Sequence, residues 1–225
     1  MPTLGLLMLH TRFPRPPGDV GHAQTFGFPV RRQVVHGATP ERVVRGKDPT
    51  ALQPFIDAAH ALRAEGCVAI GTSCGFLARW QRELQAALPL PVWSSALLQL
   101  AEQQSAGRRC GVLTIEAASL GAAHFEGVGA DPATPVEGIT PGSALHRTLL
   151  QDLPTLDEAD AQAQVLAAAQ RLRARVPGID ALVLECTNLP PYADALRAAT
   201  GLQVLDVVTL LTLRMQALQQ PSGLV

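Results

Sequence analysis

Short apolar runs alternate with segments of helical periodicity along nearly the whole chain. Uniformly apolar strands are typical of parallel sheets, because helices cover both faces of such a sheet. The predicted strands are residues 4–9, 30–35, 67–70, 91–93, 109–115, 179–184 and 203–205. The predicted helices are residues 50–65, 76–88, 94–105, 117–125, 155–175, 191–199 and 207–219. The pattern predicts an α/β fold of mainly parallel sheets flanked by helices.

The bulk composition narrows the function classes. The chain has 225 residues, 47% of them hydrophobic, and a formal net charge of −1. That is enough for one large α/β domain or two small lobes. A nucleic-acid-binding face would be basic, so the near-neutral charge argues against such a partner. No apolar run reaches about 18 residues, and the N-terminal residues lack a basic leader. We therefore expect a cytoplasmic protein without a membrane partner.

Two of the four cysteines follow predicted strands. Cys74 comes after the strand at 67–70 and Cys186 after the strand at 179–184. Ligands of open α/β sheets bind at the carboxyl ends of the strands. A following helix N-terminus would lower the pKa of a thiol there, and two such thiols could exchange a proton with one carbon from opposite faces. The alternative is a buried structural cysteine, which is our interpretation of Cys67 and Cys110 at strand starts.

Polar residues around these thiols are candidates for holding an anion such as a carboxylate. The predicted substrate-binding residues are Thr72, Ser73, Gly75, Thr187, Asn188, Arg12, Thr114 and Tyr192. Arginine suits bidentate carboxylate binding, although Arg12 in the loop at 10–29 could equally be a solvated surface residue. For Thr114 the alternative is a helix cap, and for Tyr192 it is packing. Glu185 adjoins Cys186 and either tunes a neighbour or points at solvent.

Other catalytic signatures are missing from the sequence. There is no Gly-x-Ser-x-Gly elbow, Walker-type loop or Gly-x-Gly-x-x-Gly fingerprint, so nothing indicates a nucleotide or a flavin. No Cys-x-x-Cys pair occurs, and the six histidines lack metal-ligand spacing. We expect neither a cofactor nor a metal.

The two cysteine segments resemble motifs of the aspartate/glutamate/hydantoin racemase superfamily. Residues 184–190 (Leu-Glu-Cys-Thr-Asn-Leu-Pro) resemble the second-cysteine motif, and residues 70–76 (Ile-Gly-Thr-Ser-Cys-Gly-Phe) occupy the place of the first. Racemases of this group have Cys-Asn-Thr where residues 71–73 read Gly-Thr-Ser, a triplet that resembles arylmalonate decarboxylase. The later cysteine, in Cys-Gly-Phe, and residues 12–19 (Arg-Phe-Pro-Arg-Pro-Pro-Gly-Asp) resemble the dimethylsulfoniopropionate lyase-like branch.

The resemblance implies two pseudo-symmetric lobes with the active site in the cleft between them. We expect residues 1–95 plus 206–225 in one lobe and 96–205 in the other. The implied activity is a cofactor-independent racemase that uses Cys74 and Cys186 for proton transfer at the α-carbon of a small carboxylate or amino acid. A lyase or decarboxylase at the same site is the first alternative, and a non-catalytic carboxylate-binding protein is the second. Family members often pair, which implies a homodimer.

Overall fold

The computed structural model describes residues 1–46 and 48–219. Its strands are β1 (Leu4–Leu9), β2 (Val30–Val35), β3 (Ala69–Thr72), β4 (Val92–Trp93), β5 (Cys110–Thr114), β6 (Val136–Gly138), β7 (Ala181–Leu184) and β8 (Gln203–Leu205). Its α-helices are α1 (Gln53–Ala64), α2 (Gln81–Ala87), α3 (Leu97–Ser105), α4 (Ala122–Val128), α5 (Ala144–Leu150), α6 (Glu158–Arg175), α7 (Ala193–Thr200) and α8 (Val207–Gln219). The π-helical turn is η1 (Glu41–Arg45), and the 3₁₀ turns are η2 (Pro49–Leu52), η3 (Gly75–Trp80), η4 (Ala117–Ser119) and η5 (Pro190–Tyr192).

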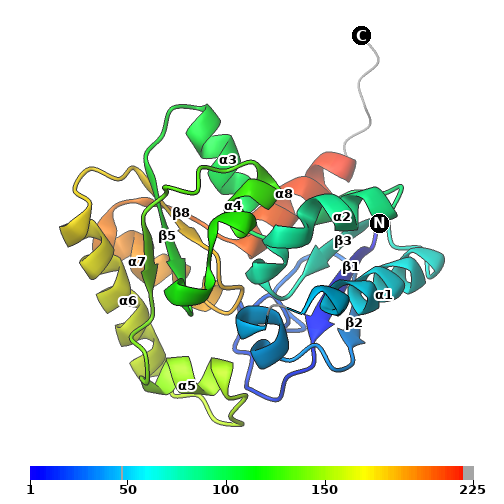
Figure 1. Ribbon diagram of the computed structural model, residues 1–225, viewed down its shortest axis with the longest axis horizontal. Helices are drawn as coiled ribbons and strands as arrows, with labels where there is room; N and C mark the ends of the chain where they lie inside the picture. The colour runs from blue at the N-terminus through cyan, green and yellow to red at the C-terminus, as the bar shows by residue number, and fades with distance from the viewer. Residues whose placement is uncertain (47, 220–225) are drawn as a thin grey trace.

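The strands form two separate four-stranded sheets. The first has the order β2-β1-β3-β4 and the second the order β6-β5-β7-β8, with parallel pairing throughout both. In Figure 1 the first sheet lies on the right, from blue to teal, and the second on the left, from green to orange, with helices around both. The predicted α/β fold with two mainly parallel sheets is therefore confirmed.

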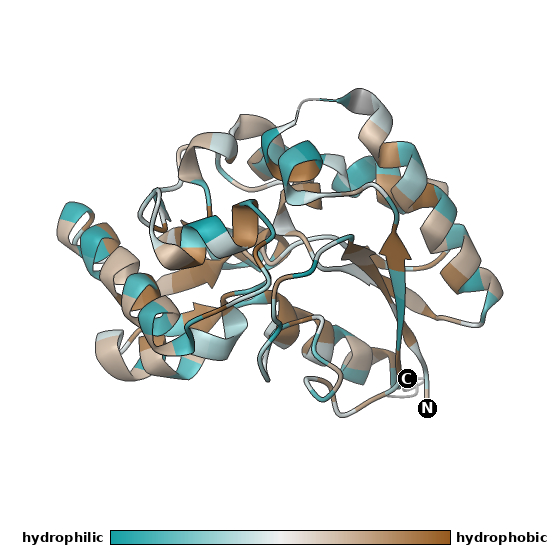
Figure 2. Ribbon diagram, turned by 90° about the horizontal axis from the view of Figure 1, so that it is seen from below, coloured by the Kyte–Doolittle hydropathy of each residue, from teal (hydrophilic) through white to brown (hydrophobic). Residues whose placement is uncertain are grey.

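Burial explains why these short segments form strands. Every residue of β1, β3, β5 and β7 is buried, and Figure 2 shows brown, hydrophobic strands among helices with alternating hydrophilic and hydrophobic surfaces. Glycines inside the strands let helices approach closely. A Cβ on Gly71 would meet Leu211 of α8 at 2.9 Å, and one on Gly111 would meet Leu172 of α6 at 2.7 Å. Helix α8 therefore packs on the first sheet and α6 on the second.

The strand registers bring the two cysteine loops to corresponding places. Thr72 ends β3 opposite Leu7 of β1, and Leu184 ends β7 opposite Leu113 of β5. Each ladder continues by one bond into the following loop, from the Ser73 N–H to Leu7 (2.8 Å) and from the Glu185 N–H to Leu113 (2.9 Å). Both loops thus leave the carboxyl end of an inner strand.

Several predicted boundaries differ from the observed ones. β3 spans Ala69–Thr72 rather than 67–70, because Gly66 adopts a left-handed φ of 87° and the Cys67 N–H bonds back to Leu62 as a helix ending. The predicted helix at 76–88 divides into η3 and α2. Helix α5 was not predicted, although the Ser143 hydroxyl accepts from the His146 N–H as an N-cap.

The two sheets use strands from different parts of the chain. The first sheet uses strands from the first 93 residues, and the second uses strands from residue 110 onward. Residues 220–225 of the predicted first lobe lie outside the described residues, and the boundaries at 95/96 and 205/206 stay a prediction.

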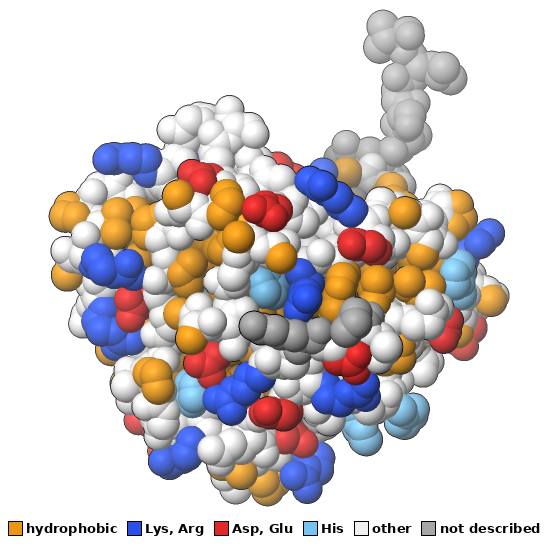
Figure 3. Space-filling model, in the orientation of Figure 1, with side chains coloured by type: hydrophobic (Ala, Val, Ile, Leu, Met, Phe, Trp, Pro, Cys, Tyr) orange, Lys and Arg blue, Asp and Glu red, His pale blue; other side chains and the backbone are white. Residues whose placement is uncertain are grey.

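The surface mixes charges of both signs. On the face seen in Figure 3, acidic and basic side chains are interspersed, with hydrophobic side chains between them. Within residues 1–46 and 48–219, no helix combines the length and the apolar character needed to cross a membrane.

Candidate active site

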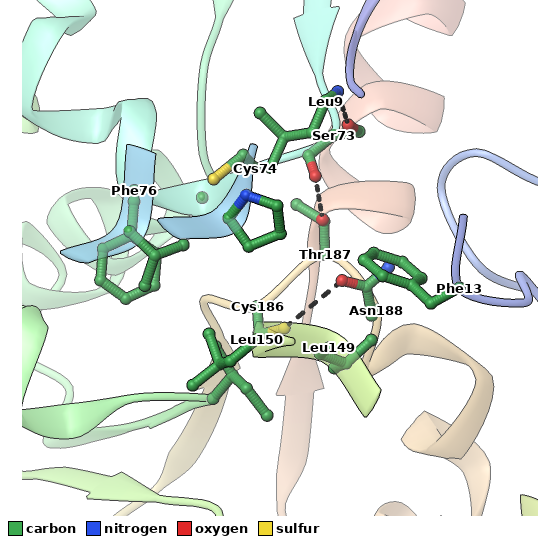
Figure 4. Close-up of a pocket in the computed structure, with 14 residues that line it drawn as sticks. Leu9, Phe13, Ser73, Cys74, Phe76, Leu149, Leu150, Cys186, Thr187 and Asn188 are labelled. Atoms are coloured by element: carbon green, nitrogen blue, oxygen red, sulfur yellow. Dashed lines mark hydrogen bonds between the residues drawn. The ribbon is translucent and has the colours of Figure 1, made fainter. Parts of the chain in front are cut away.

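Both cysteine loops line one small pocket between the sheets. The lining residues are Leu9, Phe13, Pro40, Val44, Ser73, Cys74, Gly75, Phe76, Ile115, Leu149, Leu150, Cys186, Thr187 and Asn188. Figure 4 shows Cys74 and Cys186 on opposite sides of this pocket. The contact between loops is direct, because the Thr187 hydroxyl donates to the Ser73 carbonyl at 2.6 Å.

Cys74 directly precedes η3, at the carboxyl end of the strands of the first sheet. Burial raises the pKa of its thiol to about 12, and the nearby Glu185 carboxyl adds to the rise. The backbone N–H groups of Phe76 and Leu77 face the sulfur and lower its pKa, as a helix start should. Their effect is smaller than that of burial. The expected low pKa is therefore wrong for Cys74 in the free protein.

Cys186 follows β7, at the carboxyl end of the strands of the second sheet. Burial raises the pKa of its thiol well above the usual value of 9.0, and Glu185 again adds to the rise. The Asn188 N–H acts in the opposite direction, and the Cys186 Sγ lies 3.8 Å from the Asn188 Oδ1. In the free protein both pocket thiols are therefore protonated at neutral pH.

Glu185 supplies a buried carboxyl next to both thiols. Its Oε2 accepts from the Thr114 hydroxyl at 2.6 Å, while its Oε1 is buried without a hydrogen-bond partner among the described residues. Burial raises the pKa of this carboxyl to about 8, and the Thr114 hydrogen bond lowers it. The sequence analysis left open whether Glu185 tunes a neighbour or points at solvent, and its full burial excludes the second alternative. An acidic residue directly after a buried apolar strand was the signal that could have found it.

The N-terminal loop holds Asn188 in place. Asp19 is 1% exposed, accepts from the Asn188 Nδ2 at 2.6 Å and pairs with Arg15 at 2.9 Å. The Arg15 guanidinium lies 4.8 Å above the ring of Phe13, which lines the pocket. These contacts fix the amide of Asn188 with its Oδ1 toward Cys186, a network that sequence reasoning missed.

The pocket wall is apolar. None of the fourteen lining side chains is acidic or basic. Leu149 and Leu150 come from α5, the helix that the sequence analysis missed, and Val44 comes from η1. Phe13 and Phe76 add two aromatic rings. Any charge on a ligand must therefore be met by backbone N–H groups, hydroxyls, thiols, the Asn188 amide or aromatic rings.

Six of the ten predicted site residues line the pocket. They are Ser73, Cys74, Gly75, Cys186, Thr187 and Asn188. The Ser73 hydroxyl accepts from the Leu9 N–H at 2.9 Å, which leaves its own proton for a ligand. The Thr187 hydroxyl proton is already used on the Ser73 carbonyl.

The other four residues lie outside the pocket lining. Thr72 donates to the buried Ser94 carbonyl at 2.6 Å, and Thr114 donates to Glu185. Tyr192 is buried, which raises its pKa to about 12. Arg12 is 73% exposed and pairs with Asp152 at 3.1 Å. Substrate binding by these four stays a prediction, and each has another partner or packing role in the structure.

The Arg12 pair gives a simple test of this placement. We expect Arg12→Ala to lower the free energy of unfolding by less than about 1 kcal/mol, because exposed ion pairs contribute little. The KM of Arg12→Ala for the substrate should stay within about twofold of the parent value, since the guanidinium does not line the pocket. Steady-state kinetics with urea unfolding would check both, and a tenfold rise in KM would place Arg12 on the substrate.

The buried carboxyl predicts a pH-dependent stability. The pKa of Glu185 rises on folding from 4.5 to about 8. A carboxyl whose pKa is raised on folding makes its full contribution to stability below its unfolded-state pKa. That contribution is lost as the pH rises through its folded-state pKa. From pH 5 to pH 8.5 we expect the parent protein to lose roughly 4 kcal/mol more unfolding free energy than Glu185→Gln. Urea unfolding at the two pH values measures this, and an equal pH dependence would show that Glu185 is ionised in the fold.

No cluster of three or more potential metal-ligating acidic, histidine or cysteine side chains occurs within residues 1–46 and 48–219.

The structure offers a small, largely apolar pocket between two parallel sheets, with one thiol on each side. These features define an α/β protein with a paired-thiol site.

The sequence places this protein in a family. A model of the Asp/Glu/hydantoin racemase family matches residues 93–214, more than half of the chain. The chain belongs to this family. Dimethylsulfoniopropionate lyase 5 of Emiliania huxleyi is 31% identical over 93% of this chain and 44% of its own length. A dimethylsulfoniopropionate lyase of Durusdinium sp. clade D is 31% identical over 92% of this chain and 71% of its own. This chain thus spans less than half of the first relative.

Solved structures share the fold at low identity. Unliganded arylmalonate decarboxylase superimposes with a TM-score of 0.62 and 16% identity, over 99% of this chain and 94% of the other. A putative Asp/Glu racemase from Yersinia pestis gives a TM-score of 0.62 and 17% identity, over 97% of this chain and 100% of the other. These matches agree with the two-sheet architecture.

Proposed function

We propose that this pocket removes the proton α to the carboxylate of a small substrate and that expulsion of a β leaving group follows. The protein would then be a lyase of the dimethylsulfoniopropionate type. The observation that carries the proposal is a pair of thiols across a pocket without a charged side chain.

The uncharged wall limits the substrate. Aspartate and glutamate each bring two carboxylates and an ammonium group, and a charge buried without a partner is costly. A substrate with one carboxylate and a weakly hydrated sulfonium fits better, because aromatic faces attract such cations. Phe13 and Phe76 contribute the aromatic rings of the pocket lining. The curated relatives named as dimethylsulfoniopropionate lyases support the same substrate class.

The elimination follows from these groups. The thiolate of Cys74 or Cys186 takes the α-proton, and the C–H electron pair forms the double bond between Cα and Cβ. The Cβ–S bond breaks at the same time or afterwards, so that neutral dimethyl sulfide and acrylate leave. The substrate cation lowers the pKa of a nearby thiol, which offsets the burial that keeps the free thiols protonated. The small apolar pocket keeps water away from the carbanion-like state.

Ser73 is the side chain best placed to hold the substrate carboxylate. Its hydroxyl accepts from Leu9 and retains its own proton. We expect Ser73→Ala to reduce kcat/KM by roughly 10- to 100-fold, because a donor to the developing negative charge is lost. Thr72→Val is the matched control: its hydroxyl proton is used on Ser94, outside the pocket, so its kcat/KM should change by less than about threefold. Equal losses in the two variants would remove Ser73 from the binding role.

Racemisation is the second candidate, and the position of the thiols favours it. Cys74 and Cys186 face the pocket from opposite sides, as proton exchange on the two faces of one carbon requires. A racemase would use one thiol as base and the other as acid. The difference from the lyase is the fate of the carbanion, not its formation.

Product analysis separates the candidates. The protein is incubated with dimethylsulfoniopropionate, and dimethyl sulfide and acrylate are measured by gas chromatography and NMR. Equal amounts of both products, absent with Cys186→Ser, are the expected result. Interconversion of aspartate or glutamate enantiomers without elimination would instead indicate a racemase. No reaction with any of these compounds would favour a non-catalytic carboxylate-binding protein.

A further inference from the structure

The Glu185 carboxyl lies in the contact between the two cysteine loops. Its side chain is fully buried, and its Oε1 has no hydrogen-bond partner within the described part of the chain. A Cβ on Gly75 would come closer than 3.0 Å to both the main-chain oxygen and the Oε1 of Glu185. Gly75 follows Cys74, and Glu185 precedes Cys186. The carboxyl therefore sits beside both thiol-bearing loops at once.

Few polar groups surround this carboxyl. The Thr114 hydroxyl on β5 donates to its other oxygen, Oε2. No basic side chain forms a salt bridge with Glu185 among the described residues. Cys74 and Cys186 are the titratable groups on the adjoining loops, and a charge on Glu185 raises the pKa of each thiol.

Other charged groups reach the thiols from the N-terminal loop. Arg15 lowers the pKa of Cys74, and Asp19 raises that of Cys186. These two side chains are paired with each other at 2.9 Å. Behind η3, His124 packs edge-on against Phe76, and burial lowers its pKa. Among the described residues, none of these groups forms a hydrogen bond with the Glu185 carboxyl, whose partner is the Thr114 hydroxyl.

We propose that Glu185 is a positioning residue for the thiol chemistry, and that its carboxyl must be uncharged for a thiolate to form at Cys74 or Cys186. Two like charges in a water-poor site repel strongly, so the three groups share one negative charge. The thiolate population therefore stops rising with pH once Glu185 ionises in alkaline solution. The consequence for turnover rests on the proposed function, whereas the effect on the thiols does not.

Alkylation rates test the proposal without a substrate. The intact protein and Glu185→Gln are treated with iodoacetamide from pH 6 to pH 10, and labelling of each cysteine is followed by peptide mass spectrometry. In the parent protein the logarithm of the rate at Cys74 and Cys186 should rise to about pH 8 and then flatten. In Glu185→Gln it should keep rising. The two proteins should agree at pH 6.5 and differ roughly tenfold at pH 9.5.

A second variant keeps the test valid if Glu185→Gln does not fold. Thr114→Val removes the hydrogen bond that favours the ionised carboxyl, so the point of flattening should move to higher pH. Cys67 and Cys110 serve as internal controls, since they lie outside the pocket. Parallel pH–rate curves in all three proteins would overturn the proposal. If the curves separate as expected but no elimination occurs, the proposed function fails and the role of Glu185 stands.

Discussion

Cys186→Ser is expected to lower turnover by roughly 10²- to 10⁴-fold, the usual contribution of a positioned base or acid. A serine hydroxyl has nearly the shape of a thiol but a much higher pKa, so it neither forms an anion in this apolar pocket nor accepts a carbon-bound proton. The Cys186 thiol is a weak donor, and its side-chain contact is with the Asn188 Oδ1 at 3.8 Å, so the fold should persist. Steady-state assays with circular dichroism would measure both effects.

Cys110→Ser is the matched control. Cys110 is also a buried cysteine of the second sheet, but it begins β5 at the end opposite the pocket. We expect its turnover to stay within about threefold of the parent value. Full activity in Cys186→Ser would contradict the thiol mechanism, and equal losses in the two variants would point to a general effect on folding.

Gly75→Ala is expected to lower the free energy of unfolding by roughly 3 kcal/mol. The added Cβ would meet the main-chain oxygen and the carboxyl of Glu185 closer than 3.0 Å. Main-chain atoms at the end of a buried strand cannot move aside cheaply, so the two cysteine loops must separate. Urea unfolding would measure the loss, which should be accompanied by faster alkylation of both pocket thiols.

Gly27→Ala is the control for this prediction. A Cβ on Gly27 has nothing within 4 Å, and the substitution should change stability by less than about 0.5 kcal/mol. If Gly75→Ala proved as stable as Gly27→Ala, the close contact between Gly75 and Glu185 would not exist in solution.

Local patterns predicted much of the fold. β1, β2, β8 and α8 begin and end where the sequence analysis placed them, because their apolar runs are bounded by turn or capping residues. Helix α5 was missed because it has only seven residues, follows a Pro-Gly turn and lacks a polar face along its whole length. Two of its leucines line the pocket, so the missed helix also hid part of the wall.

The parts of the site that depend on neighbouring residues in the sequence were predicted, and the parts that depend on tertiary contacts were missed. Cys74 and Cys186 meet in one pocket, as their places after parallel strands indicated. The direction of their pKa shifts was wrong, because the helix-start effect is local whereas burial depends on how the two sheets close over the thiols. The burial of Glu185 could not be predicted for the same reason. One residue more or less at a strand end determines whether a side chain faces solvent or the core.

The central claim is that paired thiols break a C–H bond α to a carboxylate in this pocket. The most direct measurement is proton NMR in D₂O with dimethylsulfoniopropionate, both enantiomers of aspartate and glutamate, a hydantoin and an arylmalonate, using the parent protein, Cys110→Ser and Cys186→Ser. The account predicts an alkene or α-deuterium with at least one compound in the first two proteins and neither in Cys186→Ser. The same α-carbon chemistry at an undiminished rate in Cys186→Ser would contradict it.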